Sequence, residues 1–144
     1  LETRVPGHSG IGTTLSGSKI QLALMRAVLE NYFTREAFAP LIALAKKLEK
    51  GIADVIIKHS VPWHVVRVGA RVEFMCTPTR PRNGGEAAAV IHRPIDVALH
   101  HYLLNRGVIV TPFHNMMLIC PSTTEAHVNR LVEGLDRCLA ELLS

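Results

Sequence analysis

Hydrophobic residues recur at steps of three and four positions in three long stretches of the chain, which is the period of an α-helix. Residues 19–32 are apolar around most of the circumference of such a helix, so we expect this helix to need protein on several sides. Residues 34–59 form an amphipathic pattern that begins at a suitable N-cap, Thr34, and ends before Pro62, because proline cannot continue the helical hydrogen bonds. The third stretch follows residues 122–125, Ser-Thr-Thr-Glu, which have the spacing of a capping box.

Between residues 63 and 76 the period changes to two, as in a strand with one buried face. The apolar positions alternate with charged ones: Val66, Val68, Ala70, Val72, Phe74 and Cys76 against Arg67, Arg71 and Glu73. This alternation predicts one half-buried strand, and Gly69 in its middle predicts a bend.

The remaining sequence alternates between loop signals and structured segments. Residues 77–85 contain two prolines and two glycines, which predicts an irregular loop. Residues 94–105, with proline in the first turn, predict a helix that ends at a left-handed Gly107. Residues 108–111 and 116–120 are mostly apolar and predict two short strands joined by a brief connection.

With 144 residues, 48% of them apolar and 19% charged, the chain has the size and composition of one packed globular domain. No apolar run approaches the roughly 18 residues of a membrane-spanning helix, and no signal peptide is expected. The formal net charge is +4, but the basic residues are scattered and aromatic residues make up only 5%. That pattern argues against nucleic-acid binding. We therefore expect neither a membrane nor a nucleic acid as a partner.

The three cysteines, Cys76, Cys120 and Cys138, are odd in number, far apart and without a Cys-x-x-Cys motif. This argues against a disulfide framework and for a reducing, cytoplasmic compartment. Each cysteine lies in an apolar pattern, so each is expected to behave as a small buried hydrophobe.

Eight histidines raise the question of a metal site. His100 and His101 are adjacent and therefore point to different sides of a helix. Neither a His-Glu-x-x-His motif nor a cluster of cysteine and histidine occurs in the sequence, so we expect no metal. His114 follows Phe113 between two predicted strands, where it is either a residue at the mouth of an active site or a polar turn residue.

Residues 7–18, Gly-His-Ser-Gly-Ile-Gly-Thr-Thr-Leu-Ser-Gly-Ser, combine four glycines with five hydroxyl residues directly before the first predicted helix. A bare backbone at a helix N-terminus, with its free N–H groups and positive dipole, favours an anion such as phosphate. The same composition also suits a flexible linker. The segment is not a P-loop, because Lys19 comes one position late and is followed by Ile20 rather than by serine or threonine.

Residues 12–17, Gly-Thr-Thr-Leu-Ser-Gly, followed by a helix rich in small residues, resemble the Gly-Gly-Thr-Leu-Ser-Gly-Asn-Pro segment of class III aminotransferases. These are pyridoxal-phosphate enzymes of fold type I, and the chain resembles their glutamate-1-semialdehyde aminomutase branch most. The chain departs from the family pattern at Thr13, where glycine is common, and at residues 18–19, where Asn-Pro is common. Further segments resemble local sequences of the family: residues 67–70, 104–110 and 122–125.

The resemblance implies the α+β fold of the small C-terminal domain of fold type I, with a short antiparallel sheet and helices on one face. Residues 1–33 would then be a phosphate loop and linker helix from the large domain, and residues 34–144 would form the small C-terminal domain. The predicted order of elements (helix, helix, strand, helix, strand, strand, helix) agrees with an α+β layer. An upstream large domain is therefore implied as a partner.

The resemblance further implies pyridoxal 5'-phosphate as cofactor, and transfer of an amino group through its pyridoxamine form onto a small keto acid or within one substrate. Thr14 matches the family threonine that binds the cofactor phosphate, typically across the interface of a homodimer, with Thr13 and Ser16 as helpers. The Schiff-base lysine of the family precedes this threonine, and no lysine precedes Thr14 here. We therefore expect no catalytic residue in this chain, an inactive isolated chain, and an aminotransferase or aminomutase as its full-length parent.

Arg71 is the candidate substrate-binding residue, because a guanidinium can hold a carboxylate in a bidentate pair. The alternative is an arginine on the polar face of a strand. Arg80 and Arg82, in the loop that follows, are either specificity residues or solvated loop charges. A second hypothesis for the whole chain is a free-standing α+β module that binds a phosphorylated ligand through residues 10–18, and it predicts a natural chain that begins near Leu1.

Overall fold

The computed structural model describes residues 14–111 and 114–144, and the chain divides into two compact units after Phe38. The division falls within the first turns of helix α2 (Arg35–Lys58), so most of α2 and all later elements belong to the second unit. The domain boundary between residues 33 and 34 that the sequence suggested stays a prediction.

Helix α1 (Lys19–Asn31) follows a short 3₁₀-helix, η1 (Thr14–Gly17), and agrees with the first predicted helix. None of the side chains of α1 is buried, and the exposed ones include large apolar residues: Ile20, Leu22, Leu24, Met25, Val28 and Leu29. A contiguous apolar surface of this kind is typical of a surface that another protein segment covers. The cover that the sequence led us to expect for this helix stays a prediction.

The sheet has three antiparallel strands in the order β1-β2-β3: β1 (His64–Val68), β2 (Arg71–Met75) and β3 (Met116–Leu118). β1 and β2 are the two arms of a hairpin, so the prediction of one bent strand over residues 63–76 is wrong. Gly69 has a φ of 58°, in the left-handed region that glycine adopts without strain. Together with Ala70 it reverses the chain within two residues, so that Val68 lies opposite Arg71.

The hairpin also changes which side chains share a face of the sheet. Residues directly opposite each other in an antiparallel pair lie on the same face. Val68 therefore lies with Arg71 and Glu73, and it is 76% exposed, whereas Val72 and Phe74 occupy the other face and are buried. We call the first of these the open face, and its residues are His64, Val66, Val68, Arg71, Glu73, Met75, Met116 and Leu118.

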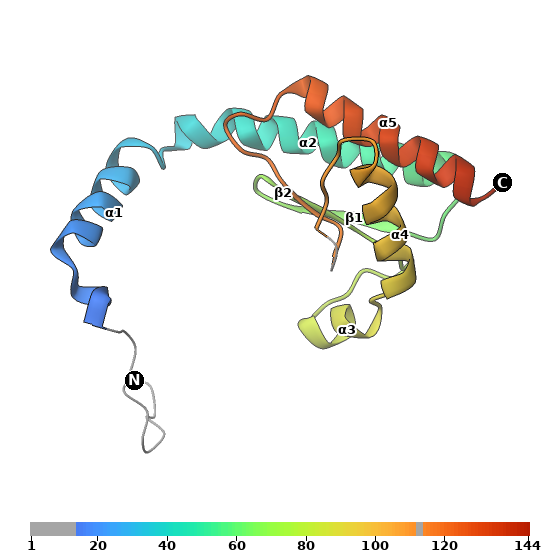
Figure 1. Cartoon of the computed structure of the whole chain (residues 1–144), viewed down its shortest axis with the longest axis horizontal. Helices are drawn as coiled ribbons and strands as arrows, with labels where there is room; N and C mark the ends of the chain where they lie inside the picture. Colours follow the sequence, from blue (N-terminus) through green and yellow to red (C-terminus); the bar gives the residue numbers. More distant parts are fainter. Residues whose placement is uncertain (1–13, 112–113) are drawn as a thin grey trace, which may run out of the picture. The chain divides into compact units, whose positions relative to one another are not determined.

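Helices α2, α4 (Arg93–Leu104) and α5 (Glu125–Leu142) pack on the face opposite to the open face (Figure 1). α2 and α5 run parallel, since ion pairs join Lys47 to Glu125 and Lys58 to Asp136 at the same sequence separation. The core includes buried apolar residues from all of these elements: Leu48, Ile52, Val72, Phe74, Leu99, Leu103, Met117, Leu131, Leu135 and Leu139. The predicted α+β fold, a short antiparallel sheet with helices on one face, is confirmed.

Two segments differ locally from their predictions. A short helix, α3 (Gly84–Ala89), begins inside the expected loop, because Asn83 caps it by accepting a 2.9 Å hydrogen bond from the N–H of Glu86. Residues 108–110 do not pair as a strand, so of the two strands predicted after α4 the described residues form only β3.

The ends of α4 and α5 show how the local sequence stops and starts these helices. Gly107 has the predicted left-handed conformation, with a φ of 76°, and its N–H donates to the carbonyl of Leu104 over 3.0 Å. α5 begins with a capping box in which the Thr124 hydroxyl accepts from the N–H of His127 and His127 Nδ1 accepts from the N–H of Thr124. The box therefore starts two residues later than the sequence predicted, and its N3 residue is histidine instead of the usual glutamate or glutamine.

Candidate functional site

The residues predicted to bind phosphate lie only partly within the described part of the chain. Residues 10–13, including Thr13, lie outside it, and Thr14 is the first residue of η1. Ser16 also lies in η1 and is exposed. Ser18 is the N-cap of α1, and its own side chain makes no capping hydrogen bond to the helix. Such a helix end can accept an anion, and the assignment of these residues to phosphate stays a prediction.

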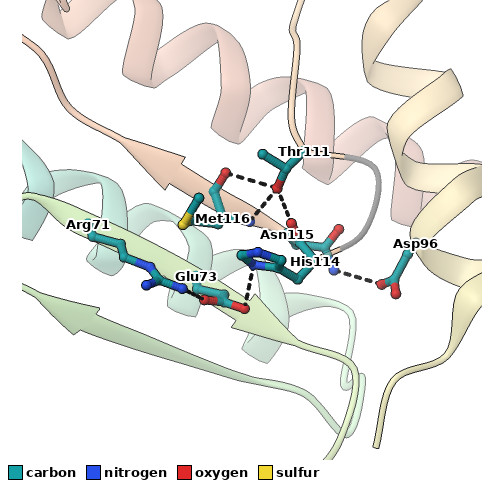
Figure 2. A network of polar contacts seen from close by, with 7 residues as sticks. All are labelled: Arg71, Glu73, Asp96, Thr111, His114, Asn115 and Met116. Carbon is teal, nitrogen blue, oxygen red and sulfur yellow. Dashed lines mark hydrogen bonds and ion pairs between the residues drawn. The ribbon is translucent and has the colours of Figure 1, made fainter. Parts of the chain in front are cut away.

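Arg71 and Glu73 lie beside each other on the open face, two positions apart on the central strand β2 (Figure 2). Arg71 Nη2 donates to Glu73 Oε2 over 2.7 Å. The side chain of Arg71 is 47% exposed and that of Glu73 only 16%. A guanidinium has five N–H donors in a planar fork, and Glu73 takes one of them. Most donors of Arg71 are therefore open to a further anion.

The second carboxylate oxygen of Glu73 contacts His114, which precedes β3. His114 Nδ1 lies 3.0 Å from Glu73 Oε1, and Figure 2 shows the imidazole beside the carboxylate. The hydroxyl of Thr111 donates to the carbonyl of His114 and accepts from the N–H of Met116 over 3.3 Å. These bonds join Thr111 to His114 and to the first residue of β3. His114 is thus a partner of β2 rather than a solvated turn residue.

Asn115, the next residue along the chain, binds helix α4. Its Nδ2 donates to Asp96 Oδ1 over 2.9 Å, and the two residues are only 4% and 5% exposed (Figure 2). Asp96 lies in the first turn of α4, where the helix dipole favours a negative charge. The adjacent residues His114 and Asn115 therefore link the start of β3 to strand β2 and to helix α4.

The open face is hollowed next to Arg71. The hollow measures about 640 Å³ and has apolar lining residues: Val66, Val68, Met75, Pro81 and Ala87. Arg71, Arg80 and Arg82 line it together. Arg82 is paired with Glu86 at 3.0 Å, whereas Arg80 has no hydrogen bond or ion pair to any described residue. Three arginines that the sequence places on a strand and in a loop thus gather around one apolar hollow, which suits a ligand with a carboxylate and an apolar part.

Arg71 and His114 were candidates from the sequence alone, whereas the residues that connect them to the fold were not. The alternating pattern marked Glu73 only as a polar-face residue of a strand. Asp96 was visible as an acidic residue near a helix start, and Asn115 as a turn residue. No sequence signal shows that Asp96 is buried, because its partner is an amide contributed by a segment 19 positions away.

The three cysteines differ in their environments. Burial raises the pKa of Cys76 to about 12, with the charge of Asp96 adding to the effect, and burial raises the pKa of Cys138 to about 11. Cys120 is exposed, so the prediction that all three are buried is wrong. Hydrogen bonds from Ser122 and then Thr123 stabilise its thiolate and lower its pKa to about 7.

Residues 14–111 and 114–144 hold neither a cluster of metal-ligating side chains nor a helix suited to cross a bilayer. No three histidine, cysteine or acidic side chains there gather as ligands for a metal ion. No helix in these ranges is both long and apolar enough to cross a bilayer.

No protein-family model matches the chain. Glutamate-1-semialdehyde 2,1-aminomutase 1 of Macrococcus caseolyticus is 27% identical to it over 132 residues, and the glutamate-1-semialdehyde 2,1-aminomutase of Clostridium kluyveri is 24% identical over 125 residues. These matches cover 90% and 85% of this chain. The chain spans 30% of the length of each of these curated relatives.

Solved structures show the same similarity. A glutamate-1-semialdehyde aminomutase from Pseudomonas aeruginosa in complex with PMP has a TM-score of 0.86 and 44% identity over 99% of this chain and 31% of its own. A β-phenylalanine aminotransferase from Variovorax paradoxus has a TM-score of 0.78 at 18% identity over 94% of this chain, which shows the fold alone. The predicted resemblance to the C-terminal part of glutamate-1-semialdehyde aminomutases and class III transaminases is confirmed. Pyridoxal phosphate is the cofactor of that family.

Proposed function

We propose that this chain is the C-terminal part of a pyridoxal-phosphate-dependent aminotransferase or aminomutase, with residues 1–33 as phosphate loop and linker helix and residues 34–144 as the small domain. One observation carries the proposal: 44% sequence identity and a TM-score of 0.86 over 99% of the chain. Because a fold by itself does not fix a function, the sequence identity supports the reaction class and the TM-score supports the domain assignment.

The start of the chain fits a cofactor phosphate. Thr14, helped by Thr13 and Ser16, would hold the phosphate of pyridoxal phosphate through hydroxyl and backbone N–H groups, at the active site of the partner subunit in a homodimer. The N-terminus of α1, to which the side chain of Ser18 makes no capping hydrogen bond, supports this assignment. When bound, the cofactor supplies an electron sink and carries the amino group in its pyridoxamine form. The residues of this chain hold the phosphate and orient the cofactor.

The lysine that attaches the cofactor, and the acidic partner of its ring nitrogen, would belong to an upstream large domain. Two observations support this assignment. No lysine precedes Thr14 in the sequence, and the chain matches 31% of the aminomutase structure. The isolated chain would therefore be inactive, and the parent enzyme would transfer the amino group.

Arg71 would bind the carboxylate of a small amino or keto acid substrate. Its guanidinium is half-exposed, uses one donor on Glu73 and lines the hollow of the open face. A planar guanidinium binds a carboxylate through two parallel hydrogen bonds. Arg80 and Arg82 would raise the positive potential of the hollow, and its apolar lining would contact the rest of the substrate.

The apolar surface of α1 supports a larger parent with a homodimer interface. Six large apolar side chains of this helix are between 38% and 74% exposed, and the large domain or the partner subunit would bury them. The three cysteines are all free, which supports a cytoplasmic location because oxidising compartments favour disulfides.

The experiment that tests the proposal uses the longest natural chain that contains this sequence. That chain is incubated with pyridoxal phosphate and reduced with borohydride, and the modified lysine is mapped by peptide mass spectrometry. We expect a single adduct upstream of Leu1 and none on Lys19. The isolated 144-residue chain, treated in parallel, is the control and should take up no cofactor at a specific lysine.

The alternative of a free-standing module that binds a phosphorylated ligand through residues 10–18 predicts the opposite result. A natural chain that starts at Leu1, with no specific adduct and with binding of a phosphate ester, would replace our proposal by that one.

A further inference from the structure

Three side-chain contacts, joined by the peptide bond between His114 and Asn115, connect helix α4 to the guanidinium of Arg71. Asn115 is bound to the buried Asp96, and its neighbour His114 contacts one oxygen of Glu73. The other oxygen of Glu73 accepts from Arg71 Nη2. His114 and Asn115, directly before β3, thereby link α4 to Arg71, which lines the hollow.

We propose that Glu73 is a positioning residue, which, with His114 behind it, fixes the guanidinium of Arg71 in the direction that binds the carboxylate of the substrate. This inference rests on the proposed function, in which Arg71 binds that carboxylate. Glu73 also lines the hollow, and in this inference it acts on the substrate through Arg71.

The two oxygens of Glu73 have separate partners, and this division carries the inference. Oε2 holds Arg71 at 2.7 Å and Oε1 lies 3.0 Å from His114 Nδ1. A carboxylate with one partner can rotate about its last bond, whereas a carboxylate held through both oxygens has one orientation. Glu73 is also on the central strand, opposite Val66 and Met116, and only 16% exposed. Its side chain therefore has little room to follow a moving guanidinium.

The hydrogen bond to Glu73 orients the guanidinium of Arg71 and leaves its other N–H donors available to bind an anion. A long arginine side chain has many rotamers, and ordering it costs conformational entropy when a ligand binds. The single bond to Glu73 supplies that order beforehand, since it uses one of five donors. Preorganisation of this kind strengthens binding because the ligand no longer has to order the side chain.

The test is steady-state kinetics on the full natural chain loaded with cofactor, with an amino donor that bears a carboxylate and a matched primary amine that lacks it. Arg71→Gln should raise KM for the carboxylate donor by about 10- to 100-fold, the value of a charge-assisted bidentate pair, and leave KM for the amine unchanged. Glu73→Gln should raise KM for the carboxylate donor by about 3- to 10-fold. It should leave kcat and KM for the amine unchanged.

The double variant separates positioning from a general structural effect. If Glu73 acts through Arg71, Glu73→Gln has no further effect in an Arg71→Gln background, because coupled residues are not additive. Additive effects, a lower KM in Glu73→Gln, or an equal change for the amine would overturn the inference while the role of Arg71 stands. An unchanged KM in Arg71→Gln would overturn both.

Two further variants guard the result against misfolding and against a general charge effect. Should Glu73→Gln not fold, His114→Ala removes the second contact of Glu73 and should raise KM for the carboxylate donor in the same direction, again only when Arg71 is present. Glu49→Gln is the matched control, because Glu49 forms a 2.7 Å pair with Arg67, whose register position lies on the other face of the sheet. This control should leave the ratio of the two KM values unchanged.

Discussion

Asn115 Nδ2 lies 2.9 Å from the carboxylate of Asp96, and neither residue is more than 5% exposed. No basic side chain is bonded to Asp96 among the described residues, so an amide and the helix N-terminus support a buried charge. Removing the amide leaves that charge without its side-chain partner.

Asn115→Ala should therefore lower the free energy of unfolding by about 1–3 kcal/mol, the cost of an unsatisfied buried polar group. Urea unfolding followed by circular dichroism measures the change. Asn129→Ala, at an exposed position of α5, is the matched control and should stay within about 0.5 kcal/mol. Equal stabilities of the two variants would contradict the assigned role of the pair.

Cys120 should be the reactive thiol of the chain. The thiolate is the nucleophile, and Cys120 is exposed with a pKa lowered to about 7 by Ser122 and Thr123. The rate of iodoacetamide labelling at Cys120 should rise with pH to a midpoint near 7, whereas Cys76 and Cys138, with raised pKa values, should label slowly throughout. Mass spectrometry of the labelled peptides distinguishes the three positions.

The Ser122 hydroxyl is the largest cause of the lowered pKa of Cys120. Ser122→Ala should therefore shift the labelling midpoint of Cys120 upward, toward the ordinary thiol value of 9.0. A midpoint that stays in place would show that this hydrogen bond does not stabilise the thiolate.

Asp136 should contribute stability that disappears in acid. Hydrogen bonds from Lys58 and then His59 lower its pKa below the ordinary value of 3.8. A lowered folded-state pKa gives stability that is present above the unfolded value and lost as the pH falls through the folded value. Asp136→Asn should therefore be less stable than the wild type at neutral pH, by at most about 1 kcal/mol because the pair is partly exposed.

The difference between Asp136→Asn and the wild type should shrink as the pH falls below 3.8 and through the lowered folded-state pKa. Urea midpoints at neutral and acid pH measure it. Asp54→Asn, which removes an exposed ion pair within one helix, should change stability less at neutral pH. A deficit of Asp136→Asn that persists in acid would show that the effect is not electrostatic.

The two leucines Leu24 and Leu48 test the different environments of α1 and α2. Leu48 is 2% exposed in the core and Leu24 is 62% exposed on α1. Leu48→Ala should destabilise the 144-residue chain by about 2–5 kcal/mol, and Leu24→Ala by no more than about 0.5 kcal/mol. In the full parent Leu24→Ala should become costly, because the large domain or partner subunit would bury the side chain. An equal, small effect of Leu24→Ala in both chains would argue against that cover.

Helix α5 shows how much of the local structure the sequence determines. Its apolar stripe and nearby Thr124 are local signals, and the helix forms where the three- and four-residue period predicts it. The same holds for α1, α2 and α4, which also form where the period predicts them. Gly107 ends α4 through its own left-handed backbone conformation, which is a local property of the sequence. The resemblance to class III aminotransferases was also present in the sequence, since it rests on short segments in order along the chain.

The tertiary structure alone decided what lies on the open face. A period of two does not distinguish one strand from a hairpin, and the two-residue turn at Gly69 changes the face on which Val68 lies. The contacts of Glu73 with His114 and of Asp96 with Asn115 join residues 41 and 19 positions apart. Such pairs leave no periodic signal in the sequence. In the unfolded chain each of these polar side chains forms hydrogen bonds to water, and it meets its protein partner only after the core has brought the two segments together.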